Sequence, residues 1–372
     1  MTERTDDKDV TPHPISFYAK QIRSSLPADI FAPVRNRLLW LAFHVAVAGF
    51  GIYAVARGWG GWGLAPVWSL LIGHAFAGFA FVGHETLHGA VVRNRVLRHL
   101  IGWLCFMPIA LSPRLWVVWH NKVHHGHTMD EKIDPDAFPT LAAWKASPAL
   151  RAVDQLSVGS GRLAGIFMLL FGFSGQSGQM LLSWGRKEGR ASGAMSQRNW
   201  RLALLESLLA VAIWTALAVA VGPLKFIFAY LIPLGVVNMI VISYILTNHS
   251  LSPLGEVNDP LLNSLSVTAP GPFNWLHLHF GLHVEHHLFP SMSSANAHLV
   301  RDQLKARWPE RYQIMPLFRA LALLWKTPRV YASPTVLIDP NTGKQVPTLH
   351  AGLVDRVEDA PPPSLPLVAA ST

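Results

Sequence analysis

The sequence contains one cysteine, Cys105, among 372 residues. A disulfide within the chain is therefore impossible, and zinc or iron–sulfur sites made of four thiolates are excluded. Charge is also scarce, since 14% of the residues are Asp, Glu, Lys or Arg, whereas 51% are hydrophobic. Average globular domains are about 25% charged, so this composition indicates an integral membrane protein.

Four apolar stretches are long enough to cross a bilayer as helices, which takes about 20 residues. They cover residues 38–55, 64–83, 202–221 and 226–247. A shorter stretch over 96–111, and one over 163–182 that is interrupted by three glycines, are interpreted as interfacial or re-entrant helices. Counting either of them as a span would place a basic loop outside the cell.

Basic residues are distributed unevenly around these stretches. They gather before the first, after the second and before the third, whereas the two intervening turns contain only Arg57 and Lys225. Basic loops are retained on the cytoplasmic side, so all three basic segments are expected there, and residues 1–37 form a cytoplasmic N-terminal segment. The first nine residues lack the basic flank and apolar core of a signal peptide, so we expect no processing.

Residues 38–328 are expected to form one all-α membrane domain with a cytoplasmic helical cap, including a cap helix over 294–307. After Pro328 the helical periodicity ends, and residues 329–372 are expected to form a flexible tail. The net charge of +9 does not point to nucleic acid, because no basic stretch is interleaved with aromatic residues in a known reader pattern. An anionic membrane surface is the simpler partner.

Eight of the 18 histidines fall into three short clusters. They are His84 and His88; His120, His124 and His125; and His283, His286 and His287. A spacing of four residues places two side chains on one face of a helix, so one metal ion can contact both members of such a pair. All three clusters fall on the same predicted face of the membrane. Eight imidazoles are too many for one ion of ordinary coordination, so the pattern predicts two neighbouring metal ions.

Imidazole ligands narrow the choice of metal. Neutral imidazole suits zinc, copper, iron and nickel, whereas magnesium and calcium prefer oxygen ligands. Two iron ions fit eight or nine nitrogens best, because iron also changes its oxidation state and can leave positions open for dioxygen. No catalytic side chain outside the metal centre is expected. His44 and His74 lie inside predicted spans, away from the clusters, and are left out of the site.

Two other classes of function remain open. The run His84-Glu85-Thr86-Leu87-His88 matches the H-E-x-x-H pattern in which two histidines bind zinc and the glutamate activates water in a metalloprotease. A membrane zinc metalloprotease needs only one further ligand, and would leave six clustered histidines without a role. A histidine-rich metal carrier is the other class, and it would release metal readily without turning over a substrate.

The three histidine clusters, in this order and with long apolar spans between the second and the third, resemble the integral membrane fatty acid desaturase superfamily. The resemblance covers about residues 38–325. It implies a mushroom-shaped protein with four transmembrane helices and a cytoplasmic cap, and a di-iron centre at their junction. Related members include acyl-chain hydroxylases and carotenoid ketolases.

The resemblance also implies a ninth ligand shortly after the last span, a position that His249 occupies. A helix-end cap is the alternative role for this segment. His127 and His279 are further candidates that could replace or supplement His249, or orient a ligand imidazole from outside. Asp134 and Asp136 could supply carboxylates that orient such rings, or could form a turn around the proline between them.

The function implied by the resemblance is a fatty acid desaturase that uses O2 and two electrons to introduce a double bond into the acyl chain of a lipid or fatty-acyl substrate. An acyl-chain or lipid hydroxylase, or a carotenoid ketolase, is the main alternative. The sequence has no nucleotide fingerprint, haem motif or cysteine cluster, so electrons must come from a separate protein such as ferredoxin or a cytochrome b5-like carrier. Arg186 and Lys187 are candidates for attracting an acidic donor.

Overall fold

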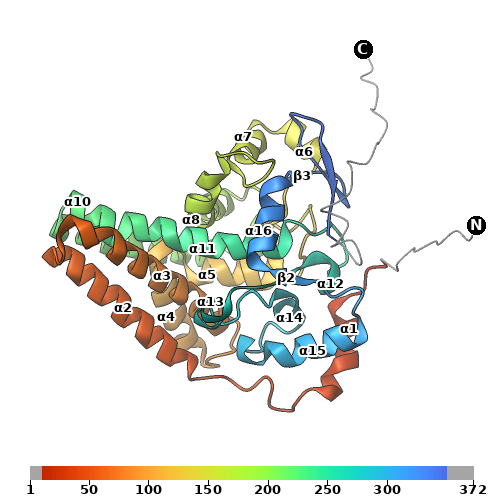
Figure 1. Cartoon of the computed structure of the whole chain (residues 1–372), viewed down its shortest axis with the longest axis horizontal. Helices are drawn as coiled ribbons and strands as arrows, with labels where there is room; N and C mark the ends of the chain where they lie inside the picture. Colours follow the sequence, from red (N-terminus) through yellow and green to blue (C-terminus); the bar gives the residue numbers. More distant parts are fainter. Residues whose placement is uncertain (1–10, 350–372) are drawn as a thin grey trace, which may run out of the picture.

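The computed structural model describes residues 11–349, which form mainly helices (Figure 1). Four long helical segments make up an apolar region that we call the membrane body. They are α2 (Arg37–Arg57), α3 (Gly61–Leu87), α9 (Gln197–Val221) and the continuous run of α10 (Pro223–Phe226), the π-helical turn η5 (Ile227–Leu231) and α11 (Ile232–His249). Each contains one of the four stretches predicted as spans, because about 20 apolar residues must satisfy their own backbone groups in a bilayer.

A fifth helix, α8 (Gly165–Gly185), is also long and apolar enough to cross a membrane, so the described residues contain five candidate spans where the sequence predicts four. The prediction treated its glycines as breaks. In apolar surroundings a backbone without hydrogen bonds is costly, so the glycines stay helical. One of them, Gly172, faces α11, because a Cβ atom built there would lie in van der Waals contact with the Ile242 side chain, at 3.4 Å.

The stretch predicted as interfacial over 96–111 is one arm of a bent pair. The first arm consists of α4 (Arg95–Phe106) and the 3-10 turn η2 (Met107–Ile109), and the second of α5 (Pro113–Trp116) and the π-helical turn η3 (Val117–His124). The arms meet at 102°, at a break where Ala110 has a φ of 52°. The bend returns the second histidine cluster to the end of α3.

Glu206 of α9 braces this bend from the membrane body. Its carboxylate accepts hydrogen bonds from the Arg114 Nε atom at 2.7 Å and from the Ser112 hydroxyl at 2.5 Å, and it lies 2.8 Å from the Nε2 atom of His99. Both arms of the pair are thereby held against one helix.

The chain after α11 folds over the end of the membrane body and forms what we call the cap segment, residues 250–326. Its elements are α12 (Pro260–Asn263), β1 (Ser266–Thr268), α13 (Gly271–Leu276), α14 (His283–Leu288), the 3-10 turn η6 (Ser294–Asn296), α15 (Ala297–Arg307), β2 (Ile314–Pro316) and α16 (Leu317–Lys326). Strands β1 and β2 pair in parallel. The helix predicted over 294–307 is confirmed as η6 and α15.

The N-terminal segment packs on the cap segment. It contains α1 (Ile15–Ile22) and the 3-10 turn η1 (Arg23–Ser25). Tyr18 and Ile22 of α1 are fully buried in a hydrophobic cluster that includes Val284 of α14 and Val300 and Leu304 of α15. The helix that carries the third histidine cluster is therefore packed from two sides.

The predicted C-terminal tail is folded over the part that the structure describes. Strands β3 (Val330–Ser333), β4 (Val336–Ile338) and β5 (Gln345–Pro347) form an antiparallel sheet. Its buried Tyr331 donates a hydrogen bond to the carbonyl of Ser252 at 2.7 Å, and the buried Arg329 donates to the carbonyl of Ser250. The flexible tail predicted from residue 329 is therefore wrong for 329–349. The predictions for residues 350–372 and 1–10 lie outside the described residues.

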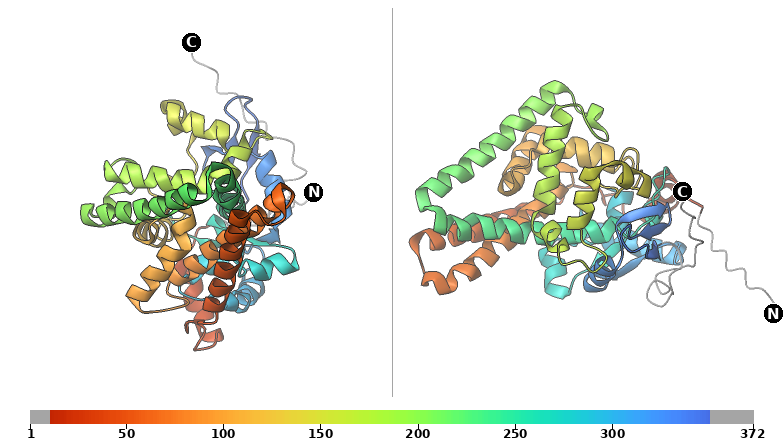
Figure 2. Two further views of the ribbon diagram at one scale, coloured as in Figure 1. Left: turned by 90° about the vertical axis from the view of Figure 1, so that its left-hand side faces the viewer. Right: turned by 90° about the horizontal axis from the view of Figure 1, so that it is seen from above.

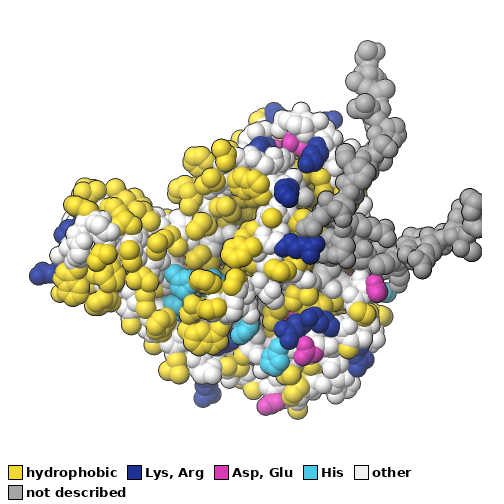
Figure 3. Space-filling view, in the orientation of Figure 1, with side chains coloured by type: hydrophobic (Ala, Val, Ile, Leu, Met, Phe, Trp, Pro, Cys, Tyr) yellow, Lys and Arg dark blue, Asp and Glu magenta, His cyan; other side chains and the backbone are white. Residues whose placement is uncertain are grey.

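Short elements complete the chain between the bent pair and α9. They are α6 (Leu141–Ala146), α7 (Pro148–Leu156) and the 3-10 turn η4 (Ser192–Ala194). Figure 2 shows the turn between α2 and α3, together with α10, at one end of the molecule. The cap segment and the three-stranded sheet lie at the other end. Figure 3 shows hydrophobic side chains covering the first end, while charged side chains lie over the second.

Candidate metal centre

The nine histidines considered as ligands converge on one place, at the junction of the membrane body and the cap segment. They come from the end of α3 (His84, His88), from η3 and its end (His120, His124, His125), from the end of α11 (His249) and from α14 (His283, His286, His287). The segments are far apart in the sequence and are brought together by the bent pair and by the return of the cap segment.

Most of these rings form two groups in which the possible ligand atoms lie within 4.8 Å of one another. The first group consists of His84, His88, His120 and His286, and the second group consists of His124, His249, His283 and His287. His125 adjoins the first group, because its Nε2 atom lies 3.2 Å from the Nε2 atom of His120 and 3.0 Å from that of His286. The first group thus draws on α3, η3 and α14, and the second draws on η3, α11 and α14.

The second cluster is divided between the groups, although the sequence predicts that one ion contacts His120 and His124 together. This part of the chain is a π-helical turn, in which the amide of His125 donates to the carbonyl of His120, five residues earlier. The two rings stay nearly parallel, at 21° with their centroids 5.2 Å apart, and π-helical turns of this kind are frequent at functional sites. A smaller set, His120, His124 and Asp136, also has possible ligand atoms within 4.8 Å.

The spacing of the nitrogens fits a metal site. Neighbouring Nε2 atoms lie 3.1 Å apart in His84 and His120, 2.8 Å apart in His249 and His283, and 3.1 Å apart in His283 and His287. Two metal–nitrogen bonds of about 2.1 Å at right angles place their nitrogens about 3 Å apart. The Nε2 atom of His88 is buried and has no hydrogen-bond partner. Its lone pair is therefore free to bind a metal ion.

Burial keeps several of these rings in the form that binds metal, whereas the Asp134 carboxylate outweighs burial at His124 and raises its pKa to about 9. Burial lowers the pKa of His125, His286 and His287 well below the ordinary value, and the neighbouring imidazoles lower it further. These three rings are therefore neutral near pH 7, with a lone pair available on one nitrogen. A neutral, all-nitrogen set of this kind suits a transition metal and not magnesium or calcium.

Three rings of the second group are oriented by polar groups that contact their Nδ1 atoms, on the side away from the centre. The Nδ1 atom of His124 lies 3.1 Å from the Asp134 carboxylate, that of His249 lies 3.0 Å from the carbonyl of Asn263, and that of His287 lies 3.2 Å from the Thr128 hydroxyl. The carboxylate and the carbonyl can only accept, and the hydroxyl already donates to the carbonyl of His124 at 2.8 Å. Each ring therefore carries its proton on Nδ1 and presents the lone pair of Nε2 to the centre.

The structure also places the residues for which the sequence left more than one role open. Asp134 both contacts His124 and accepts from the amides of Met129 and Asp136, so it orients a ring and forms a turn. His127 is exposed and His279 is partly buried, and neither belongs to the two groups. His249 lies within the second group.

Glu85 does not face the centre as the protease pattern requires. Its carboxylate lies 3.3 Å from the Nε atom of Arg37 and accepts hydrogen bonds from the Ser293 hydroxyl and the Ser294 amide, both at 3.0 Å. The glutamate therefore ties α3 to α2 and to the turn before α15. Its position gives no support to a water-activating role.

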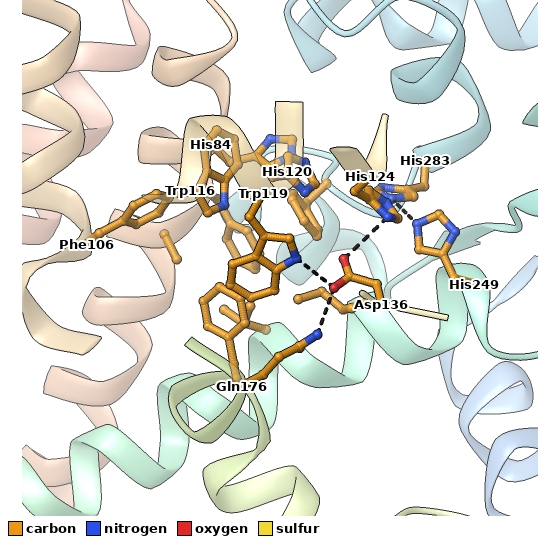
Figure 4. A pocket seen from close by; sticks show the side chains of 16 residues that line it. His84, Phe106, Trp116, Trp119, His120, His124, Asp136, Gln176, His249 and His283 are labelled. Atoms are coloured by element: carbon orange, nitrogen blue, oxygen red, sulfur yellow. Dashed lines mark hydrogen bonds and ion pairs between the residues drawn. The ribbon is translucent and has the colours of Figure 1, made fainter. Parts of the chain in front are cut away.

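An apolar pocket between α3, η3, α8 and α11 reaches the centre (Figure 4). Phe106, Trp116, Phe173, Val241 and Ile245 are among its walls. Its lining includes histidines of both groups, namely His84, His120, His124, His249 and His283.

A polar contact interrupts the apolar wall beside the centre. The Oδ1 atom of Asp136 accepts hydrogen bonds from the indole of Trp119 at 2.8 Å and from the amide of Gln176 at 2.7 Å, and its Oδ2 atom lies 3.3 Å from Nδ1 of His124 (Figure 4). Gln176 was not predicted, and neither were Thr128 and Asn263. No motif marks them, because their roles depend on contacts between distant segments.

Comparison with known proteins agrees with this geometry. A family model described as fatty acid desaturase matches residues 60–318. An "sn-1 acyl-lipid omega-3 desaturase (ferredoxin)" from Synechocystis is 30% identical over 125 residues, which cover 34% of either chain. The chloroplastic "omega-6 fatty acid desaturase" of Spinacia oleracea is 21% identical over 310 residues, 80% of this chain and 66% of that one.

A longer alignment joins the chain to an "sn-1 oleoyl-lipid 12-desaturase" of Synechocystis, with 21% identity over 336 residues that cover 87% of this chain and 90% of the relative. The first two relatives, in contrast, are matched over less than two thirds of their length. The family model spans more than half of the chain, and all nine histidines lie within it. On this match the chain belongs to the fatty acid desaturase family.

Proposed function

We propose that this protein is a membrane-bound di-iron desaturase that introduces a double bond into the acyl chain of a membrane lipid, using O2 and electrons from a separate carrier protein. One observation carries the proposal: a single apolar pocket touches histidines of both metal-binding groups. A saturated hydrocarbon chain fits such walls, and a chain in this pocket lies against both groups at once.

The proposed ligands are the histidines of the two groups together with His125. They are His84, His88, His120, His124, His125, His249, His283, His286 and His287. Bound iron would supply the oxidising chemistry with O2. The chain's own residues hold the rings in place, through Asp134, Asn263 and Thr128, and keep the acyl chain in apolar surroundings from which water is excluded.

The proposed topology has four spans, with the centre on the cytoplasmic side. The first and second histidine clusters converge, so an even number of crossings separates them, and the bent pair enters and leaves on one side. The second and third clusters converge too, so only two of α8, α9 and the Pro223–His249 run cross fully. Helix α8 has the lowest mean hydropathy of the three, 1.2 against 2.2 for each of the others, and is proposed as the one that does not cross.

The proposed electron donor is a soluble acidic protein of the ferredoxin or cytochrome b5 kind. Two of the similar desaturases are named as ferredoxin enzymes. Arg186 and Lys187 are exposed at the end of α8 and offer positive charge to such a partner. Reversing both charges should slow reduction and flatten its dependence on salt, and unchanged kinetics would remove this surface from the proposal.

Metal analysis and product analysis of the purified protein test the function. We expect about two iron ions per chain and, with reductant, carrier and O2, acyl chains that have lost two mass units, read by mass spectrometry of the lipids. Chains that gain the mass of one oxygen would favour the hydroxylase alternative. Zinc in place of iron, or iron without any consumption of O2, would contradict the proposal.

A further inference from the structure

A second set of polar side chains lies where the membrane body meets the cap segment, apart from the nine histidines. The hydroxyl of Tyr244 in α11 lies 2.9 Å from Nδ1 of His277, and Nε2 of His277 lies 3.2 Å from Nε2 of His74 in α3. Tyr244 and His277 are buried, with 2% and 7% of their surface exposed, and His74 is partly exposed. A hydrogen-bonded row thus runs from the interior to the surface of the apolar region.

This row ends next to the metal centre. The Tyr244 ring packs against the Phe280 ring at 5.6 Å, and Phe280 packs against His84 of the first group at 4.9 Å. One aromatic ring therefore separates the phenol from a proposed ligand. Phe81 contacts Tyr244, His277 and Phe280 as well, with ring centroids 5.7, 5.2 and 4.8 Å away.

The backbone beside the row is strained. Leu278 and His279 follow His277 directly and have φ angles of 54° and 57°, in the left-handed region that non-glycine residues rarely occupy. Strain of this kind is typical of functional sites. The reversal directs His277 toward α3 and α11, and Phe280 toward His84.

His44 is another histidine of the membrane body, and its surroundings differ from those of His277 and His74. Its ring is buried, makes no hydrogen bond through Nε2, and packs against the backbone of α3, where a Cβ atom on Gly78 would overlap it. The row formed by Tyr244, His277 and His74 has partners along its whole length. Polar residues inside a membrane are costly and mark functional sites more often than packing.

We propose that Tyr244 is a redox-active tyrosine, that His277 is its proton acceptor, and that His74 is the next acceptor in the relay. The proposal rests on the di-iron function given above. If O2 reacts at the centre without an acyl chain in the pocket, the phenol of Tyr244 would give one electron to the iron held by the proposed ligands. The O–H proton of Tyr244 moves to Nδ1 of His277, and the Nε2 proton of His277 moves to Nε2 of His74.

The step balances as one electron to the metal centre and one proton to His74, which leaves a neutral phenoxyl radical on Tyr244. Formation of this radical would protect the ligands of the metal centre. An oxidant with no substrate beside it would otherwise attack its own ligands, and the relay moves that oxidising equivalent to a residue from which an external reductant can remove it.

Electron paramagnetic resonance of the iron-loaded protein tests the relay. The reduced protein in detergent, without added lipid, is mixed with O2 and frozen at short times. We expect a tyrosyl radical in the wild type, its loss in Tyr244→Phe, and its retention in Tyr230→Phe, whose hydroxyl also lies in the membrane body but donates to the carbonyl of Pro108. Repeated exposure to O2 without lipid should inactivate Tyr244→Phe several-fold faster than Tyr230→Phe, while both form product when lipid is present.

Isotope exchange separates a relay from a purely structural hydrogen bond. Because the proton moves with the electron, radical formation should slow in D2O for the wild type, and His277→Asn should weaken the signal without changing iron content. A radical that persists in Tyr244→Phe, or a wild type that consumes O2 without forming one, would overturn the relay and leave the proposed function standing. Protein that retains no iron and consumes no O2 in any variant would overturn both.

Discussion

The two groups of histidines differ in how firmly they are held. All four rings of the second group are buried, whereas three of the first group, His88, His120 and His286, are only partly buried. The second group has hydrogen-bond partners behind three of its rings, while within residues 11–349 no hydrogen bond holds an Nδ1 atom of the first group. One set of ligands is thus preorganised, and the other is free to adjust.

The difference has a structural origin. The second group lies where η3, α11 and the cap segment meet, so side chains and carbonyls of three segments surround its rings. The first group lies against aromatic side chains, with Trp116 and Phe280 packed on His84 at 5.4 and 4.9 Å. Aromatic faces fix the position of a ring but not its tautomer, so we expect the first group to be the one that changes its coordination during the reaction.

Loss of a ligand should have the largest effect. We predict that His124→Ala, in the second group, and His286→Ala, in the first, both abolish product while the protein still inserts into the membrane, because a missing imidazole leaves a metal position unfilled. Iron analysis sharpens the comparison, since each variant should lose iron from its own group. His127→Ala is the matched control, because this ring is exposed two residues beyond the second cluster. Full activity in both group variants would refute the ligand assignment.

Removing the carboxylate behind one ring should have the next largest effect. Asp134→Asn keeps the shape of the side chain but loses the charge that His124 meets, and we predict a fall in iron affinity of about 10–100-fold at the second group. Equilibrium titration with ferrous iron measures it. Asp130→Asn is the control, because that buried carboxylate accepts from the amide of Lys132 and contacts no ligand ring. Equal losses in the two variants would mean that Asp134 acts only on stability.

Removal of iron by a chelator should show directly that the two groups hold their metal with different strength. With a soluble ferrous chelator in excess, we expect iron to leave the wild type in two phases of about equal amplitude, the faster from the partly exposed first group. Absorbance of the chelate, followed in time, gives both rates. Asp134→Asn should bring the phases together by speeding the slower one. A single phase in the wild type would show that the groups are equally well held.

The sequence predicts the parts of this centre that depend on local chemistry. Length and apolarity suffice to predict four long apolar helices, because a bilayer demands both of any helix that crosses it. Imidazoles in three clusters suffice for the presence of a metal-binding site. The division of the rings between two groups was not predictable, since the spacing of His120 and His124 does not show which histidines of other segments each of them will meet.

Long-range contacts account for the other differences. Residues 329–349 lack helical periodicity and were predicted as a tail, but Arg329 and Tyr331 hold the short strands against residues 250–252. The same holds for Thr128 and Asn263, which are unremarkable polar residues until the chain brings them behind His287 and His249. Only the folded chain shows these pairings.

The smallest predicted effect concerns the link between the pocket wall and the second group. Gln176→Met keeps the length of the side chain but removes one hydrogen bond to Asp136, which retains the one from Trp119. A lost hydrogen bond of this kind is worth about 1 kcal/mol, so we expect a several-fold drop in turnover with little change in iron content. Ser174→Ala is the control on the same helix, because the Ser174 hydroxyl accepts a hydrogen bond from the Asn238 amide of α11 and does not contact Asp136. If both variants lose the same activity, the effect comes from the packing of α8; if only Gln176→Met does, the wall of the pocket acts on the second group through Asp136.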